Sequence, residues 1–110
     1  MLNFENEQRV GAHVIRFAGR LDAITVPDVR PAIEELILRG GRVIVDLSRL
    51  DMIDSSGVAL IVSLFKRLRA TGGSVCVAGV TGQPQEIFHF LRLDHSLPLA
   101  GSVDDALAAD

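Results

Sequence analysis

The residues from Val43 to Val58, VIVDLSRLDMIDSSGV, decide the fold. Val43-Ile44-Val45 is a continuous apolar run rather than an alternating one, which is typical of a strand covered on both faces. A short polar loop is expected next, and Asp54-Ser55-Ser56-Gly57 then opens a helix that runs to Ala70. Apolar residues recur through that helix at the spacing of one broad face. They are Leu60, Ile61, Leu64, Phe65 and Leu68.

Further strands are expected on both sides of this unit. Residues 2–8 are a weak candidate for an edge strand, and the turn Gly11-Ala12 separates them from a second strand at residues 13–18. Residues 74–80 predict another buried strand, and residues 97–100 a short last one. The first pair reads as a hairpin, which adds an antiparallel edge to the sheet.

A helix is predicted between the hairpin and the central strand. Thr25 can cap its start, and Pro27 suits its first turn. Gly40 ends it in the way that glycine usually ends a helix. Pro31 lies about one turn inside, where it should bend or loosen the helix.

Two helices are expected near the carboxyl end of the chain. The first covers residues 85–91 and should bury Ile87, Phe90 and Leu91, and the second covers residues 103–109. Strands separated by single helices imply right-handed crossovers and a mostly parallel sheet. The sequence therefore predicts one α/β domain, with a mixed, mostly parallel sheet of four to five strands and three to four helices packed against it.

The composition excludes several classes of protein. With 110 residues and 48% hydrophobic residues, the chain is long enough for one packed core and is not disordered. A net charge of −3 gives no basic footprint for direct nucleic-acid binding. Cys76 has no partner for a disulfide, the amino end lacks a signal-peptide pattern, and no uncharged stretch reaches the ~20 residues of a membrane span. We expect a cytoplasmic protein that does not bind a membrane.

The motifs of common enzymes and cofactor sites are missing from the sequence. It has no glycine-rich phosphate loop and no Gly-x-Ser-x-Gly elbow. His13, His89 and His95 do not have the spacing of a metal pair. Asp46 and Asp54 lie near the carboxyl end of a central strand, where a phospho-accepting aspartate would lie, but the one lysine, Lys66, lies inside a helix. We therefore expect no enzyme activity, no metal and no cofactor.

Asp54-Ser55-Ser56-Gly57 allows two interpretations from residue chemistry alone. Serine and aspartate satisfy free N–H groups at a helix start and commonly contribute about 1 kcal/mol, so the motif is explained by capping. Gly57 would permit close backbone approach. A serine at a helix amino end can also carry a phosphate, because that end of the helix favours negative charge. Both interpretations stay open at this point.

Three segments give the chain a family resemblance. Gly19-Arg20-Leu21-Asp22, Val43 to Leu47, and Met52 to Val58 resemble the matching elements of stand-alone STAS domains from bacterial anti-sigma factor antagonists. The order of strands and helices is similar over nearly the whole chain. The resemblance implies that residues 1–110 form a single STAS domain with a role in transcription regulation.

The resemblance also implies a partner-switching mechanism. In that family the second serine, here Ser56, is phosphorylated by an anti-sigma factor that is a serine kinase, and Ser55 is a lesser candidate. The unphosphorylated form binds the kinase, the phosphorylated form is released, and a serine phosphatase resets it. The implied partner-binding surface consists of Asp22, Asp54, Ser55, Ser56, Gly57 and Val58.

A second function is compatible with the same fold. Some STAS-like domains are accessory subunits of transporters, including lipid-transport ATP-binding cassette complexes, and they dock through the same helix start without a phosphorylation switch. The paired serines favour the switch. A plain enzyme is disfavoured by the missing motifs.

Overall fold

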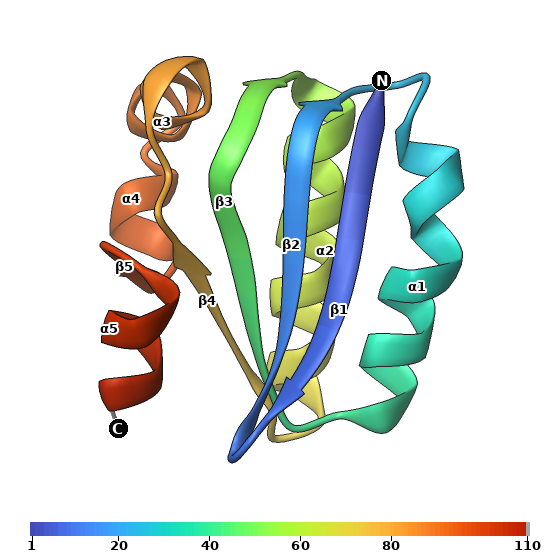
Figure 1. Cartoon of the computed structure of the whole chain (residues 1–110), viewed down its shortest axis with the longest axis vertical. Coiled ribbons are helices and arrows are strands. Elements are labelled where there is room, and N and C mark those ends of the chain that lie inside the picture. Colours follow the sequence, from blue (N-terminus) through green and yellow to red (C-terminus); the bar gives the residue numbers. More distant parts are fainter. Residues whose placement is uncertain (110) are drawn as a thin grey trace.

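The computed structural model describes residues 1–109, in which a five-stranded sheet has the order β1-β2-β3-β4-β5 (Figure 1). β1 runs antiparallel to β2, and the other neighbouring pairs are parallel. The predicted α/β class and mixed sheet are confirmed, although the described residues hold five helices rather than three to four. The strands are β1 (Leu2–Arg9), β2 (Ala12–Leu21), β3 (Arg42–Ile53), β4 (Ser74–Ala78) and β5 (Leu99–Ala100). The helices are α1 (Val26–Arg39), α2 (Ser55–Ala70), α3 (Gly82–Phe90), α4 (Leu93–Ser96) and α5 (Val103–Ala108).

The main core lies between the sheet and helices α1 and α2. Phe17, Val45 and Val77 from the strands meet Val29 of α1 and Leu64 of α2 in one buried cluster. Figure 1 shows α2 running behind the central strands. Each such side chain stabilises the fold by roughly 1.5–3 kcal/mol on burial, so this cluster fixes α2 firmly to the sheet.

The opposite face of the sheet is covered only in part. Ala106 of α5 packs there against Val14 and Ile44 in a smaller apolar cluster. Farther along the same face lie Arg16 and Asp46, whose Nε and Oδ2 atoms are 3.3 Å apart in an ion pair. One end of this face is therefore apolar and covered, and the other is polar and open.

The central strand is longer than the sequence predicted. The prediction of a polar loop after Leu47 is wrong, because β3 continues to Ile53. Only Asp54 separates the end of β3 from the start of α2. The extension pairs with β2, with Ala18 opposite Arg49 and two shifts of register on the way. β2 also extends beyond its predicted end at residue 18, as far as Leu21. Pairing with this part of β2 holds the polar residues that follow Leu47 in the strand.

The start of α1 differs from the expected cap. Thr25 occupies the cap position, but its side chain does not cap the helix. Its backbone is already in the right-handed helical region, and its hydroxyl donates instead to the Arg20 carbonyl oxygen at 2.9 Å. Pro31 lies inside the helix without ending it, and Gly40 ends it at φ 69°, as predicted.

The carboxyl-terminal helices correct a prediction of the core. α3 starts at Gly82, so Pro84 and Phe88, four residues apart, form its buried side. The expected burial of Phe90 and Leu91 is wrong, since they are 83% and 48% exposed. Ile87 is partly buried. The short helix α4 was not predicted, and β4 ends at Ala78 rather than at residue 80.

The amino end lies at the end of the sheet where β2 and β3 finish (Figure 1). The Met1 carbonyl oxygen accepts a hydrogen bond from the Arg20 backbone N–H at 3.0 Å. Helix α2 begins at this same end of the sheet. None of the helices in the described part of the chain has the length and apolar character that a membrane crossing requires.

Candidate functional site at the amino end of α2

Asp54 is the cap of α2, and its carboxylate joins two segments. Oδ1 accepts hydrogen bonds from the backbone N–H groups of Ser56 at 2.9 Å and Gly57 at 3.1 Å. Oδ2 accepts one from the backbone N–H of Ala23, at 3.1 Å, in the loop between β2 and α1. The capping that the sequence assigned to serine and aspartate together is therefore carried out by Asp54.

The two serines are the first residues of α2. Ser55 is exposed and Ser56 is half-buried. Neither hydroxyl makes a hydrogen bond within residues 1–109, and the only buried side-chain oxygen or nitrogen without a partner in that range belongs to Asp94. The Ser56 hydroxyl is thus not fully buried and has no partner among residues 1–109, at the positive end of a helix dipole.

Asp22 organises the loop that faces this helix start. Its Oδ1 accepts hydrogen bonds from the backbone N–H groups of Ile24 and Thr25, both at 3.0 Å. The backbone N–H of Thr25 is the main reason that the pKa of Asp22 lies below its ordinary value. Ile24 stands out from the loop and is 84% exposed.

Gly57 and Val58, the remaining two residues of the predicted surface, lie beneath that surface. A Cβ on Gly57 would come within 2.5 Å of the Leu21 carbonyl oxygen, so only glycine allows α2 to approach the end of β2 this closely. Val58 is 8% exposed and belongs to the core cluster. The structure thus gathers all six predicted residues around one helix start, with Gly57 and Val58 shaping it from the inside.

Gln83 is a residue of this site that the sequence reading missed. Its side-chain oxygen accepts from the Ile53 backbone N–H at 2.9 Å, and its side-chain nitrogen donates to the Ile53 carbonyl oxygen at 3.0 Å. Ile53 immediately precedes Asp54. A glutamine in a polar turn has no local pattern that would reveal such a contact.

The histidines are placed away from one another or on a single carboxylate. His13 contacts Asn6 and Gln8, whereas His89 Nδ1 lies 3.0 Å from Asp94 Oδ2, with His95 on the other oxygen at 3.9 Å. Within residues 1–109 there is no group of three or more His, Cys, Asp or Glu side chains arranged to hold a metal ion.

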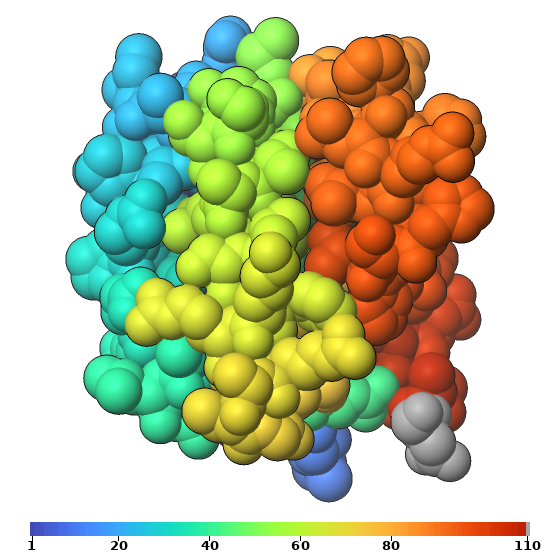
Figure 2. All heavy atoms as spheres, turned by 180° about the vertical axis from the view of Figure 1, so that it is seen from behind, coloured from blue at the N-terminus to red at the C-terminus, as the bar shows by residue number. Residues whose placement is uncertain are grey.

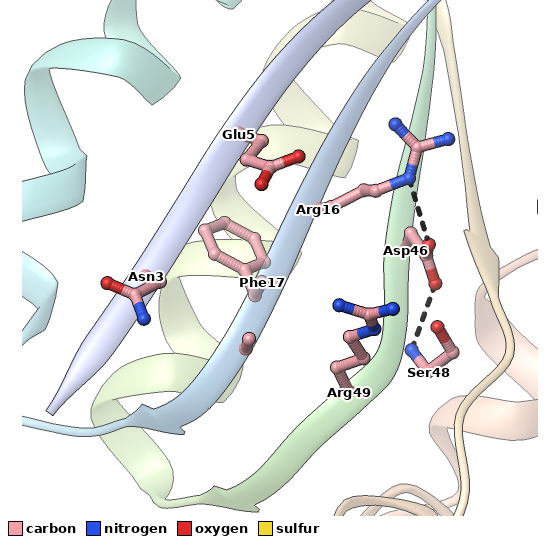
Figure 3. A pocket seen from close by; sticks show the side chains of 8 residues that line it. Asn3, Glu5, Arg16, Phe17, Asp46, Ser48 and Arg49 are labelled. Atoms are coloured by element: carbon pink, nitrogen blue, oxygen red, sulfur yellow. Dashed lines mark hydrogen bonds and ion pairs between the residues drawn. The ribbon is translucent and has the colours of Figure 1, made fainter.

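A hollow of about 350 Å³ lies over the open face of the sheet (Figure 3). Asp46 holds Arg16 there and accepts a hydrogen bond from the Ser48 backbone N–H at 2.9 Å. Figure 3 shows Arg49 and Glu5 beside this pair. Asp46 therefore serves a local polar network on the face of the sheet opposite α2.

Comparison with known proteins identifies the class. The profile of the STAS domain family matches residues 3–106, so the chain belongs to the STAS domain family. It is 30% identical to the anti-sigma-B factor antagonist of Listeria monocytogenes, over 84% of this chain and 82% of the relative.

Solved structures agree with this assignment. An anti-sigma factor antagonist from Mycobacterium paratuberculosis superposes with a TM-score of 0.90, at 23% identity, over 97% of this chain and 92% of the other. The phosphorylated form of the Bacillus cell fate determinant SpoIIAA gives a TM-score of 0.76 at 27% identity, over 96% of each chain. The first superposition shows the fold. The second shows that the chain is also similar to a relative whose structure was solved in its phosphorylated form.

Proposed function

We propose that this protein is an anti-sigma factor antagonist whose partner binding is switched by phosphorylation of Ser56. In its unphosphorylated form it binds an anti-sigma factor that is a serine kinase, and phosphorylation releases it. A serine phosphatase restores the binding form. The protein acts in the cytoplasm by binding, and the catalysis belongs to its partners. The observation that carries the proposal is the half-buried Ser56 at the start of α2, whose hydroxyl has no hydrogen-bond partner among residues 1–109, in a chain whose relatives are named anti-sigma factor antagonists.

The chemistry at Ser56 is a phosphoryl transfer from ATP. The serine oxygen forms a new bond to the γ-phosphorus, the bond from that phosphorus to the bridging oxygen breaks, and ADP leaves. The hydroxyl proton passes to a base on the kinase. The phosphatase reverses the modification with water, which gives inorganic phosphate and the free hydroxyl.

The switch follows from charge at the helix start. A phosphate adds about −1.5 to −2 charges at neutral pH, and the amino end of α2 can hold it without unfolding. Asp54 already places one carboxylate oxygen 2.9 Å from the backbone nitrogen of Ser56. A partner that covers this surface would have to remove water from two adjacent anions. Such a cost readily reaches several kcal/mol, and about 1.4 kcal/mol changes affinity tenfold.

The unmodified surface has the chemistry of a protein contact. Ile24 is 84% exposed, and Met52 is 38% exposed near the end of β3. Ile24 adjoins Ala23, which is bound to Asp54. Apolar side chains next to a small neutral serine suit docking, and a dianion at the serine would oppose it.

The first experiment asks whether Ser56 is modified and whether the modification matters. Phosphopeptide mass spectrometry of the protein from its host should find phosphate on Ser56. Affinity for the host's anti-sigma factor is then measured for wild type, Ser56→Ala and Ser56→Asp. We expect Ser56→Ala to bind within about threefold of wild type and Ser56→Asp to bind about 10- to 100-fold more weakly. Equal binding by Ser56→Asp, or phosphate found only at other residues, would contradict the proposal.

A further inference from the structure

We infer that Gln83 is a positioning residue for Ser56, which acts by holding the backbone of Ile53. The geometry stands by itself, while its consequence for phosphorylation depends on the proposed function. Gln83 lies in the first turn of α3, and Ser56 lies in the first turn of α2. The two segments meet at the end of β3.

The end of β3 needs a partner on the side where β4 has stopped. β4 pairs with β3 only from Arg42 to Asp46, whereas β3 continues to Ile53. The Asp54 N–H donates to the Leu21 carbonyl oxygen on the β2 side, at 3.2 Å, so the N–H and C=O of Ile53 point the other way. The side-chain amide of Gln83 meets both of them and replaces a neighbouring strand. Buried backbone groups require such partners.

Gln83 is itself held in a fixed place. The next residue, Pro84, is buried, and Phe88 on the following turn of α3 is part of the main core. Because α3 is anchored through these side chains, the amide of Gln83 is a rigid support. It fixes the residue just before Asp54, and Asp54 in turn holds the Ser56 backbone.

A precise position matters for the transfer of a phosphoryl group. The serine oxygen must lie in line with the bond that breaks, and a displacement of about 1 Å can lower a rate about 100-fold. Loss of the Gln83 support frees the end of β3 and with it the first turn of α2. The expected effect is slower phosphorylation of bound protein, with little change in the concentration needed for binding.

The test uses Gln83→Met, which keeps the length of the side chain and removes both hydrogen bonds. Ser102→Ala is the control, since it removes the hydrogen bond that caps α5 and leaves the site unchanged. Both full-length variants are incubated with host extract and radiolabelled ATP over a range of protein concentrations, and their melting temperatures are measured in parallel. Hydrogen exchange of the Ile53, Asp54 and Ser56 amides is followed by NMR without any partner.

We expect Gln83→Met to lower the maximal labelling rate at Ser56 about 10- to 100-fold, with a half-saturating concentration within about twofold of wild type. Its Ile53 amide should exchange at least about tenfold faster. Ser102→Ala should match wild type in the labelling of Ser56 and in the exchange of the Ile53 amide. Labelling of Gln83→Met at the rate of Ser102→Ala would overturn the inference. If wild-type Ser56 takes no label, the proposed function fails, and unchanged exchange at Ile53 would then overturn the role of Gln83 separately.

Discussion

At the scale of single residues, one carboxylate determines how the site is built. Asp54 accepts two hydrogen bonds from its own helix and one from the loop that carries Ile24. The hydroxyls of the two serines beside it make no hydrogen bond within residues 1–109. This division explains why a motif that looks like a cap from sequence can present a free hydroxyl.

This division of roles predicts unequal costs of mutation. Asp54→Ala loses the cap and the bond to Ala23, so we expect the free energy of unfolding to fall by about 2 kcal/mol. Ser55→Ala removes a hydroxyl without a partner in the described structure and should stay within about 0.5 kcal/mol of wild type. Urea unfolding followed by circular dichroism measures both. A larger loss for Ser55→Ala than for Asp54→Ala would show that serine provides the cap.

Gly57 is required by a close approach of backbones. In an ordinary helix, replacing glycine by alanine adds about 1 kcal/mol of stability. Here the new Cβ would lie 2.5 Å from the Leu21 carbonyl oxygen and 2.7 Å from Ile53 Cγ1. We therefore expect Gly57→Ala to destabilise the fold by about 1–3 kcal/mol in urea unfolding. A gain in stability would mean that α2 does not pack this closely.

At the scale of elements, α3 is the support on which the end of β3 depends. Its two aromatic residues have opposite environments, since Phe88 is buried in the core and Phe90 is 83% exposed. From the sequence, Phe90 is expected in the core because it shares one helical face with Ile87 and Leu91. The structure buries Pro84 and Phe88 instead.

The two phenylalanines form a matched pair for mutation. Phe88→Ala should lower the free energy of unfolding by about 3–5 kcal/mol, because it leaves a cavity under α3. Phe90→Ala should change it by less than about 0.5 kcal/mol. Thermal and urea unfolding of both variants gives the comparison. Similar losses in the two would place Phe90 in the core after all.

The order of elements could be predicted from the sequence because it depends on local patterns. Apolar runs such as Val43-Ile44-Val45 and the glycines that follow the two long helices, α1 and α2, mark several boundaries. The length of β3 could not be predicted, because its polar extension is held by pairing with β2. The contact between Gln83 and Ile53 joins residues 30 positions apart and has no sequence signal. The six residues of the candidate site did come together, because they adjoin two neighbouring strand ends.

At the scale of the whole molecule, acidic groups make the fold sensitive to low pH. Four carboxyl groups have pKa values below their ordinary range because they accept hydrogen bonds or pair with bases. For Glu34 the main cause is the hydrogen bond from Arg67. A lowered pKa means that the ionised form favours the folded state, and this stabilisation is lost as pH falls through the folded value. The four groups are Glu7, Asp22, Glu34 and Asp94.

The sign of this effect is open to direct measurement. We expect the urea midpoint to be nearly constant down to the ordinary glutamate value of 4.5 and to decrease below it. Glu34→Gln should flatten part of that decrease, because it removes the group paired with Arg67. The effect of any one pair is small, since these side chains are exposed and screened by salt. A midpoint that stays constant to about pH 3 would contradict this assignment.

The backbone hydrogen bond between Arg20 and Met1 has a practical consequence for assays. An affinity tag fused ahead of Met1 would emerge where β2 and β3 finish, beside the loop that carries Ile24 (Figure 1). In Figure 2, viewed from behind, the green start of α2 lies at the upper edge, while the red residues of α5 lie low on the right. A fusion following α5 leaves that upper edge unobstructed, so pull-downs and labelling reactions are best run with protein handled from its carboxyl end.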